Sequence, residues 1–234
     1  MDRSRLYRIK KFLFVFISIL MIATLIRVFF IKDAKRLSTS IFQLVQYCCF
    51  MIILISPRLI KKRLNISVPI EIHGTIAIFA FSALVLGDAF NFYHTFPWWD
   101  SLLHFFSGII LSFIALWIIK VIMNEKSKYI YMNRYFTALF VVTFSLALGA
   151  FWEICEFTCD GIFHTNSQQY METTRGTLIG KKDVPLVGHE ALRDTIKDLS
   201  LDLAGSLIVA IYGIVRYDHI AKIEKEMGED DDRV

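Results

Sequence analysis

Six long apolar segments constrain what this chain of 234 residues can fold into. They cover about residues 12–31, 39–56, 69–92, 101–123, 134–158 and 195–216. An α-helix needs about 20 mostly apolar residues to cross the hydrocarbon core of a bilayer, and each segment is close to that length. Hydrophobic residues make up 55% of the chain, more than an ordinary soluble domain contains. The sequence therefore predicts an all-α, polytopic membrane helical bundle with about six transmembrane helices.

The connections between these segments leave no room for a separate soluble domain. Residues 1–223 are therefore predicted to form a single transmembrane helical domain, and residues 224–234 an acidic cytoplasmic tail. The N-terminus, MDRSRLYRIKK followed by apolar residues, is similar to the start of a signal peptide. Its apolar region is too long and no cleavage site follows, so we expect an uncleaved first helix.

Lysine and arginine are concentrated in alternate connections between the apolar segments. The N-terminus, residues 58–63, residues 120–134 and the C-terminal segment hold more basic residues than the connections between them. Because cytoplasmic loops carry the excess of Lys and Arg, this pattern predicts a multi-pass protein with both termini in the cytoplasm. The basic residues thus indicate topology, and the predicted partner is the lipid bilayer, with no nucleic acid.

Acidic residues recur at helical spacing in the last three apolar segments. They form three groups, which are Asp100 with His104, Glu153 with Glu156 and Asp160, and Asp194 with Asp198 and Asp202. Residues three, four, seven or eight positions apart lie on one face of a helix, so each group is predicted to form a stripe. In the predicted topology all three stripes lie towards the outer ends of their helices. We therefore expect them to converge on one site.

Several carboxylates gathered in a membrane need something that offsets their charge, which could be protons shared between them, the few basic residues nearby such as Arg193 and Lys197, or a bound cation. A charged side chain at the centre of a span costs about 2.5–3.5 kcal/mol on insertion scales. Carboxylate oxygens suit Mg²⁺ or Mn²⁺, and an added imidazole also allows Zn²⁺, so we predict a divalent metal ion of unresolved identity. The predicted metal ligands are His104, Glu156, Asp198, Asp202 and Asp100, and the predicted catalytic residues are Glu153 and Asp194.

Simpler interpretations exist for some of these residues. Asp100 and Asp194 stand where a helix is expected to begin, so either could be only its N-cap. His104 could be a hydrogen-bonded histidine inside the bundle, and Asp160 could lie beyond the membrane surface. Outside the acidic groups, Asp88, Asn91 and His94 could extend the site, although ordinary hydrogen bonding between helices explains them too. Arg27 in the first span can extend towards the interface or pair with an acid.

The acidic groups carry a resemblance to a known family. The patterns DxxxHFxxG, WExxE and DTxxDxxxDxxG occur at residues 100–108, 152–156 and 194–205. In this combination the chain resembles the YjdF-like family of uncharacterised bacterial membrane proteins, over roughly residues 88–212. It is more loosely similar to the VanZ-like proteins associated with glycopeptide resistance, but has Glu156 where those tend to have Gln and Asp202 where they tend to have Asn. The resemblance implies a protein of the bacterial cytoplasmic membrane with a functional site, but it implies no particular reaction.

Three functional hypotheses follow from the sequence. The first is a metal-dependent enzyme that acts on a lipid or cell-envelope precursor at the outer face. The second is a proton- or cation-coupled transporter or an ion-binding membrane protein, because intramembrane carboxylates often serve such roles. The third is a structural protein stabilised by a polar cluster. The sequence contains no phosphate-binding glycine loop, nucleophile elbow or HExxH motif, so those enzyme classes receive no support.

Overall fold

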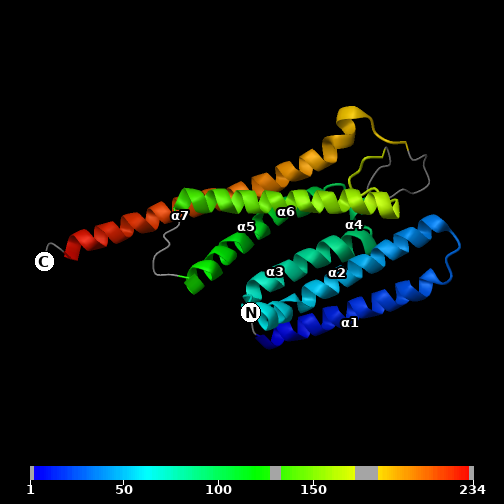
Figure 1. The fold of residues 1–234 in the computed structure, drawn as a ribbon, viewed down its shortest axis with the longest axis horizontal. Coiled ribbons are helices and arrows are strands. Elements are labelled where there is room, and N and C mark those ends of the chain that lie inside the picture. The colour runs from blue at the N-terminus through cyan, green and yellow to red at the C-terminus, as the bar shows by residue number, and fades with distance from the viewer. Residues whose placement is uncertain (1–2, 127–132, 172–183, 232–234) are drawn as a thin grey trace. The chain divides into compact units, whose positions relative to one another are not determined.

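The computed structural model describes residues 3–126, 133–171 and 184–231, and these residues form helices joined by short connections. In chain order the elements of Figure 1 are α1 (Arg3–Val28), α2 (Ala34–Leu64), α3 (Ile70–Ala80), the π-helix η1 (Phe81–Ala89), α4 (Phe92–Thr95), α5 (Trp99–Lys126), α6 (Arg134–Phe163), the 3₁₀ helix η2 (Gly188–Leu192) and α7 (Arg193–Asp231). No strand occurs among the described residues, where one isolated β-bridge joins Met171 and Pro185.

Six helical segments within the described ranges are long and apolar enough to cross a membrane. They are Tyr7–Val28, Ala34–Leu64, Ile70–Ala89, Trp99–Ile122, Arg134–Phe163 and Gly188–Arg216. Each overlaps one of the six predicted spans, so the predicted all-α polytopic membrane fold is confirmed. The C-terminal helix α7 continues to Asp231, so helical backbone extends into the segment predicted as an acidic tail.

Helix α2 extends beyond its predicted range of 39–56 at both ends, where polar residues continue it. Asp33 has extended backbone angles, and its carboxylate accepts a hydrogen bond of 2.8 Å from the Arg36 amide, which is the geometry of an N-cap. At the other end Asn65 adopts a left-handed conformation with φ of 57°, and its N–H donates to the Lys61 carbonyl. Hydropathy alone does not detect these caps, which lie outside the apolar segment.

The chain forms two compact units. The first unit comprises Met1–Leu103 and Phe151–Lys197, and the second unit comprises His104–Ala150 and Asp198–Val234. The boundaries fall inside α5, α6 and α7, so each of these helices contributes to both units. The predicted single transmembrane domain over residues 1–223 stays a prediction.

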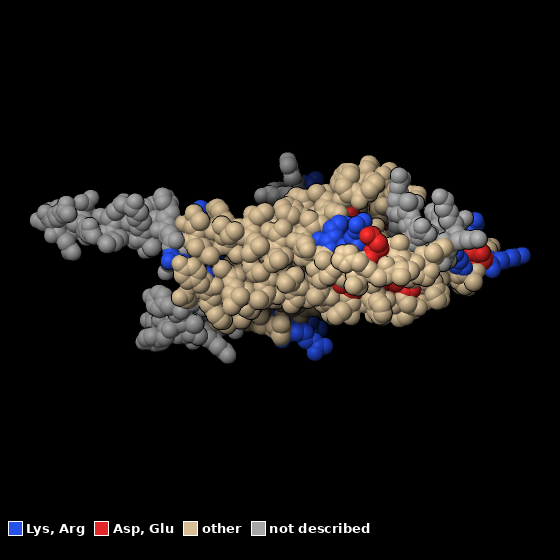
Figure 2. Space-filling view, turned by 90° about the horizontal axis from the view of Figure 1, so that it is seen from above, with Lys and Arg blue, Asp and Glu red and all other residues tan. Residues whose placement is uncertain are grey.

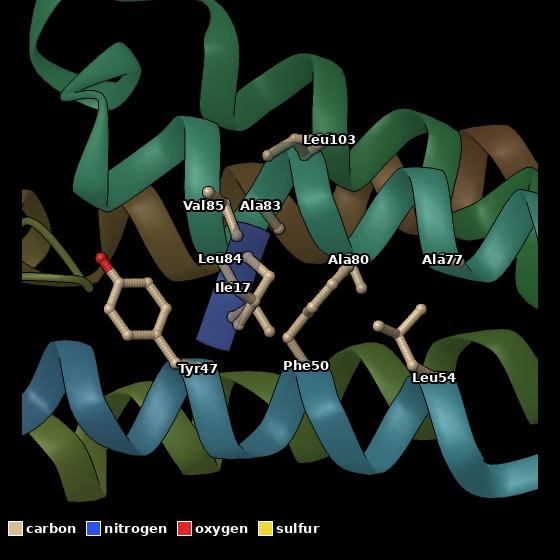
Figure 3. Packing of buried hydrophobic residues seen from close by; sticks show 10 residues of the cluster. All are labelled: Ile17, Tyr47, Phe50, Leu54, Ala77, Ala80, Ala83, Leu84, Val85 and Leu103. Atoms are coloured by element: carbon tan, nitrogen blue, oxygen red, sulfur yellow. The ribbon is translucent and has the colours of Figure 1, made fainter. Parts of the chain in front are cut away.

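The core of the first unit lies where α1, α2 and α3 pack side by side (Figure 1). Figure 3 shows Phe50 and Leu54 pointing from α2 towards the α3 side of the cluster, where Ala77 and Ala80 present small side chains. Small residues let helices approach closely, and such close approach drives association in membranes, where hydrophobicity gives no net attraction between helices. The alanines of α3 thus explain why the large α2 side chains are buried.

The third span changes its helix type before it ends. In η1 the Phe90 N–H donates to the carbonyl of Val85 over 3.0 Å, which is the five-residue spacing of a π-helix. Asn91 then adopts a left-handed conformation with φ of 63°, and the chain turns into the short helix α4. The π-helix places Asp88 in its last turn, where its side chain contacts α2.

Much of the described surface is apolar. On the face seen in Figure 2, Lys, Arg, Asp and Glu occupy a few separate patches, and other residues cover the rest. In the first unit the exposed side chains of α1 include Phe12, Ile19 and Ile22, and in the second unit those of α7 include Ile208 and Ile211. Exposed apolar side chains of this kind suit contact with lipid tails.

Candidate functional site

The second unit holds three buried ionisable side chains from two helices. His104 of α5 is 6% exposed, and Asp198 and Asp202 of α7 are 1% and 0% exposed. The His104 Nδ1 atom lies 3.3 Å from Asp202 Oδ2. A ring nitrogen of His104 and a carboxylate oxygen of Asp198 lie within 4.8 Å of each other. Both carboxylates are therefore close to one imidazole, and we call these three residues the His–Asp cluster.

Asp202 is held at both of its carboxylate oxygens. His104 faces Oδ2, and the Ser107 hydroxyl donates a hydrogen bond to Oδ1. Ser107 also lies 2.7 Å from the His104 carbonyl oxygen, one turn earlier in α5. These contacts fix the direction of the carboxylate, as the outer partners of a metal ligand do.

Glycines allow the three helices of the second unit to approach each other at this cluster. A Cβ atom at Gly108 would collide with the carbonyl oxygen of Asp202, and one at Gly205 would collide with that of Phe105. A Cβ at Gly149 in α6 would meet the Asp202 carboxylate itself. The glycines of the sequence motifs therefore bring the α5 and α7 backbones together, and they position Asp202 beside His104.

The spacing within the His–Asp cluster fits a shared metal ion. Two ligands bound at about 2.0–2.2 Å to a tetrahedral ion lie about 3.4 Å apart, and in octahedral geometry they lie about 3 Å apart. The 3.3 Å between His104 Nδ1 and Asp202 Oδ2 is compatible with either arrangement. One imidazole and two carboxylates suit Zn²⁺ or Mn²⁺, and the carboxylates alone suit Mg²⁺. The donor set therefore fits a divalent ion.

The first unit contains a cavity of about 1440 Å³. It lies at the end of the unit where α1 passes into α2, and it is also lined by residues of η1, α5, α6 and the loop after α6. Its charged and amide side chains are Arg27, Asp33, Lys35, Arg36, Gln43, Gln46, Asp88, Asn91, Asp100, Glu156 and Gln169. Two of the predicted metal ligands, Asp100 and Glu156, thus line this cavity.

Three acidic side chains of the cavity wall accept hydrogen bonds from neutral donors. The Gln46 amide donates to Asp88, and the Trp152 indole donates to Glu156 over 2.8 Å. The Gln169 amide lies 3.5 Å from Asp100. All of these contacts lie within the first unit, so these three carboxylates have amide and indole partners.

The loop after α6 is organised around Asp160, which is buried. Its carboxylate accepts hydrogen bonds from the Thr165 hydroxyl at 2.6 Å, the Ser167 amide at 2.7 Å and the Gln168 amide at 3.0 Å. The buried Asn166 accepts a hydrogen bond from the Met171 amide. Asp160 therefore has a structural role that the sequence did not reveal.

The same loop contacts one of the two predicted catalytic residues, Glu153, and the neighbour of the other, Asp194. The Gln168 side-chain amide lies 3.3 Å from Glu153 Oε2 and donates over 3.1 Å to the Thr195 hydroxyl. Asp194, next to Thr195, forms an ion pair of 2.9 Å with Lys197. Glu153 and Asp194 are both buried. The loop thus contacts Glu153 directly and the helix that carries Asp194 through Thr195.

The structure divides the predicted site residues between the two units. Asp100, Glu153, Glu156 and Asp194 belong to the first unit, and His104, Asp198 and Asp202 belong to the second. Within the first unit, Glu156 lines the cavity whereas Glu153 contacts Gln168. That all seven residues form one site stays a prediction.

The two residues considered as caps lie inside their helices. Asp100 is the second residue of α5, which begins at Trp99, and Asp194 is the second residue of α7, which begins at Arg193. Neither therefore occupies the N-cap position, which precedes the first helical residue. Both lie in the first turn, where a negative charge is favoured by the helix dipole.

Several contributing residues were missed by sequence reasoning. Ser107 sits three positions after His104, but a serine in an apolar helix gives no distinctive signal. Gln168 and Gln169 lie in a loop, where no periodicity points to their contacts. Asp88 and Arg27 were considered only as secondary residues, and the structure places both on the cavity wall.

Comparison with known proteins identifies the family. A family model described as "Predicted membrane protein (DUF2238)" matches residues 13–219. This chain belongs to that family. An uncharacterized protein of Thermotoga maritima is 26% identical over 183 residues, which are 78% of this chain and 80% of that protein. No solved structure matches the chain. The family description agrees with the six apolar helices, and the chain is a membrane protein.

Proposed function

We propose that this protein binds a divalent metal ion through the His–Asp cluster and uses it as an enzyme on a lipid or cell-envelope precursor. The observation that carries the proposal is the burial of Asp198 and Asp202 beside His104 inside apolar helices. Two buried carboxylates repel each other, and one imidazolium would balance only one of them. A dication bound between them would offset both charges.

The bound ion would polarise a phosphoryl or carbonyl oxygen or activate a water molecule. Within this chain, His104, Asp198 and Asp202 are the proposed ligands, and Ser107 orients the Asp202 carboxylate. Asp100 precedes His104 by one helical turn in α5 and, with Glu156, stays a predicted additional ligand. Glu153 and Asp194 are the proposed acid–base residues, and support for them comes from their burial next to polar partners.

The proposed setting is the bacterial cytoplasmic membrane with both termini in the cytoplasm. The excess of Lys and Arg in alternate connections supports this orientation. The acidic motifs support kinship with the YjdF-like proteins within the family. In this orientation the cavity, which lies at the α1–α2 connection, faces the outer side of the membrane.

Metal analysis of the purified full-length protein tests the proposal most directly. We expect one divalent ion per chain in the wild type, and loss of that ion in His104→Ala and Asp202→Asn. Glu190→Gln is the matched control, because Glu190 is half exposed, pairs with Arg193 and lies outside the cluster. Folding of each variant is checked by its elution as a single detergent-solubilised species. A folded wild type that takes up no Zn²⁺, Mn²⁺ or Mg²⁺ would overturn the proposal.

A second candidate function, a proton- or cation-coupled transporter, is favoured by one observation. The His104–Asp202 pair is buried between two apolar helices, and ionisable pairs inside membrane helices often lie on ion or proton pathways. Proteoliposomes containing the protein would then accumulate a cation or shift internal pH. Under the enzyme proposal they would instead consume a lipid or lipid-linked substrate without moving ions.

A further inference from the structure

The cavity of the first unit has charged walls of opposite sign. Its basic side chains, Arg27, Lys35 and Arg36, all come from the end of α1 and the start of α2. Asp88, Asp100 and Glu156 come instead from η1, α5 and α6. Asp33 is the exception among the acids, and its carboxylate caps α2. The basic wall is therefore formed by one pair of consecutive helices.

Arg27 lies within the first membrane span, and its guanidinium contacts only neutral groups among the described residues. Its Nη2 donates to the Ser40 hydroxyl at 2.9 Å and to the Gln43 side-chain oxygen at 2.8 Å. Within the described part of the chain, no carboxylate lies within ion-pair distance of Arg27, and Nε and Nη1 have no protein acceptor. A guanidinium offers five N–H donors and binds phosphate well, so Arg27 keeps donors for an anion.

The carboxylates of the opposite cavity wall, which we call the acidic wall, do not pair with Arg27. Asp88, Asp100 and Glu156 accept hydrogen bonds from Gln46, Gln169 and Trp152 within the unit. Their partners hold these carboxylates on their own side of the cavity. An incoming negative group would therefore be repelled by the acidic wall and attracted to the α1–α2 wall, which gives a ligand one orientation.

Part of the remaining cavity wall is apolar, and the space is large. Its apolar residues include Phe30, Ile31, Phe42, Val45, Ala83 and Leu84. Ligand pockets for drug-sized molecules measure about 300–1,000 Å³, and this cavity exceeds that range at about 1440 Å³. The volume and apolar lining suit a molecule that has both a charged headgroup and hydrocarbon.

We infer that this cavity binds an amphiphile with a phosphate headgroup, whose phosphate is held by Arg27 with help from Arg36. The inference goes beyond the proposed function because it gives the protein a ligand class and a binding site that do not depend on a metal ion. If the metal-dependent enzyme exists, this ligand class is its substrate class. Binding of the amphiphile is tested independently of the metal site.

Binding of short-chain lipids to the full-length protein in detergent, with a chelator present, tests the inference. The probes are dioctanoyl phosphatidic acid, uncharged dioctanoylglycerol and inorganic phosphate, and the readouts are the number bound per chain by native mass spectrometry and the dissociation constant. We expect one phosphatidic acid per chain, bound more tightly than either of the other probes. Because the chelator removes metal, a failed metal site would not abolish this binding.

Variants of the basic wall give the sharper test. Loss of a charge-assisted contact in Arg27→Gln should weaken phosphatidic acid binding about tenfold or more. Arg27→Lys keeps the charge but loses the planar guanidinium with its paired N–H donors. The affinity of this variant for phosphatidic acid should therefore lie between those of the wild type and Arg27→Gln. Arg58→Gln removes a basic residue of α2 that does not line the cavity, and its affinity should equal that of the wild type. If Arg27→Gln does not fold, Arg36→Gln replaces it with the same expected direction.

Three results would overturn the inference. The first is equal affinity for phosphatidic acid and dioctanoylglycerol, because the phosphate would then play no part. The second is an unchanged dissociation constant in folded Arg27→Gln and Arg36→Gln. The third is binding of inorganic phosphate as tight as that of phosphatidic acid, which would assign the site to a soluble phosphate instead of an amphiphile.

Discussion

The two units hold carboxylates in different ways. In the second unit Asp202 lies where glycines bring helical backbones into contact, and its neighbours are an imidazole and a hydroxyl. In the first unit Asp88, Glu156 and Asp160 accept hydrogen bonds from amides, an indole and loop backbone, and two of them line a large cavity. One arrangement is tightly packed and the other is open.

The same residue type therefore occupies two different environments in one chain. A carboxylate fixed by backbone contact cannot move away from its imidazole, which is what a metal site requires. A carboxylate on a cavity wall can exchange partners when a ligand enters. Substitutions in each unit test whether the carboxylates of the second unit are held more tightly than those of the first.

The largest effect is expected for Asp160→Ala in the first unit. The substitution removes the acceptor of three hydrogen bonds, two of them from loop amides. Hydrogen bonds to a charged group contribute about 1.5–3 kcal/mol each, so the free energy of opening this loop should fall by more than about 3 kcal/mol. Hydrogen exchange of the amides of residues 165–171 measures this change. Thr165→Val, which removes one donor, should have a smaller effect, and equal exchange rates in all three proteins would contradict the assigned role.

A smaller but global effect is expected for Gly108→Ala in the second unit. The added methyl group would meet the Asp202 carbonyl, which belongs to helical backbone and cannot turn aside. Overpacking of this kind costs about 1–3 kcal/mol, and the thermal unfolding midpoint in detergent should fall.

Gly213→Ala provides the control for this substitution, because nothing lies within 4 Å of a Cβ at that position of α7. Alanine is favoured over glycine in a helix by about 1 kcal/mol, so this control should be neutral or more stable than the wild type. If both variants unfold at the same temperature, the second unit is not packed as tightly as described.

The smallest effect on stability is expected for Ser107→Ala. The Ser107 hydroxyl shares its single proton between Asp202 Oδ1 and the His104 carbonyl, so its removal should lower the unfolding free energy by only about 1 kcal/mol. If the His–Asp cluster holds a metal ion, affinity for that ion should fall about 10-fold to 100-fold, as for other residues that orient a ligand. Ser112→Ala, which removes a bond to a carbonyl of its own helix, should leave metal affinity unchanged. Equal metal affinities for the two serine variants would show that Ser107 does not contribute to metal binding.

The fold was predictable because its main determinant is local. A segment of about 20 apolar residues needs no knowledge of its neighbours to be recognised as a span, and all six were found. The exact ends were less predictable. The extension of α2 to Ala34 depends on the cap made by Asp33, and its continuation to Leu64 includes Pro57 and several basic residues that lower the hydropathy.

The grouping of the candidate residues was predictable only where spacing along one helix carries the information. Asp198 and Asp202 are four residues apart, and the structure buries both near His104. The contacts of Gln168 with Glu153 and Thr195 depend on how a loop returns to two helices, and no periodicity encodes that path. Pairings between helices likewise require the tertiary fold.

The π-helix η1 makes the direction of Asp88 depend on the helix type of its segment. A π turn contains about one residue more than an α turn, so each residue turns the chain less far around the helix axis than the roughly 100° of an α-helix. If the same residues from Phe81 to Ala89 formed an α-helix, Asp88 would be turned away from Gln46. The contact between η1 and α2 therefore requires π pairing in this segment, and substitutions that favour α pairing would break it.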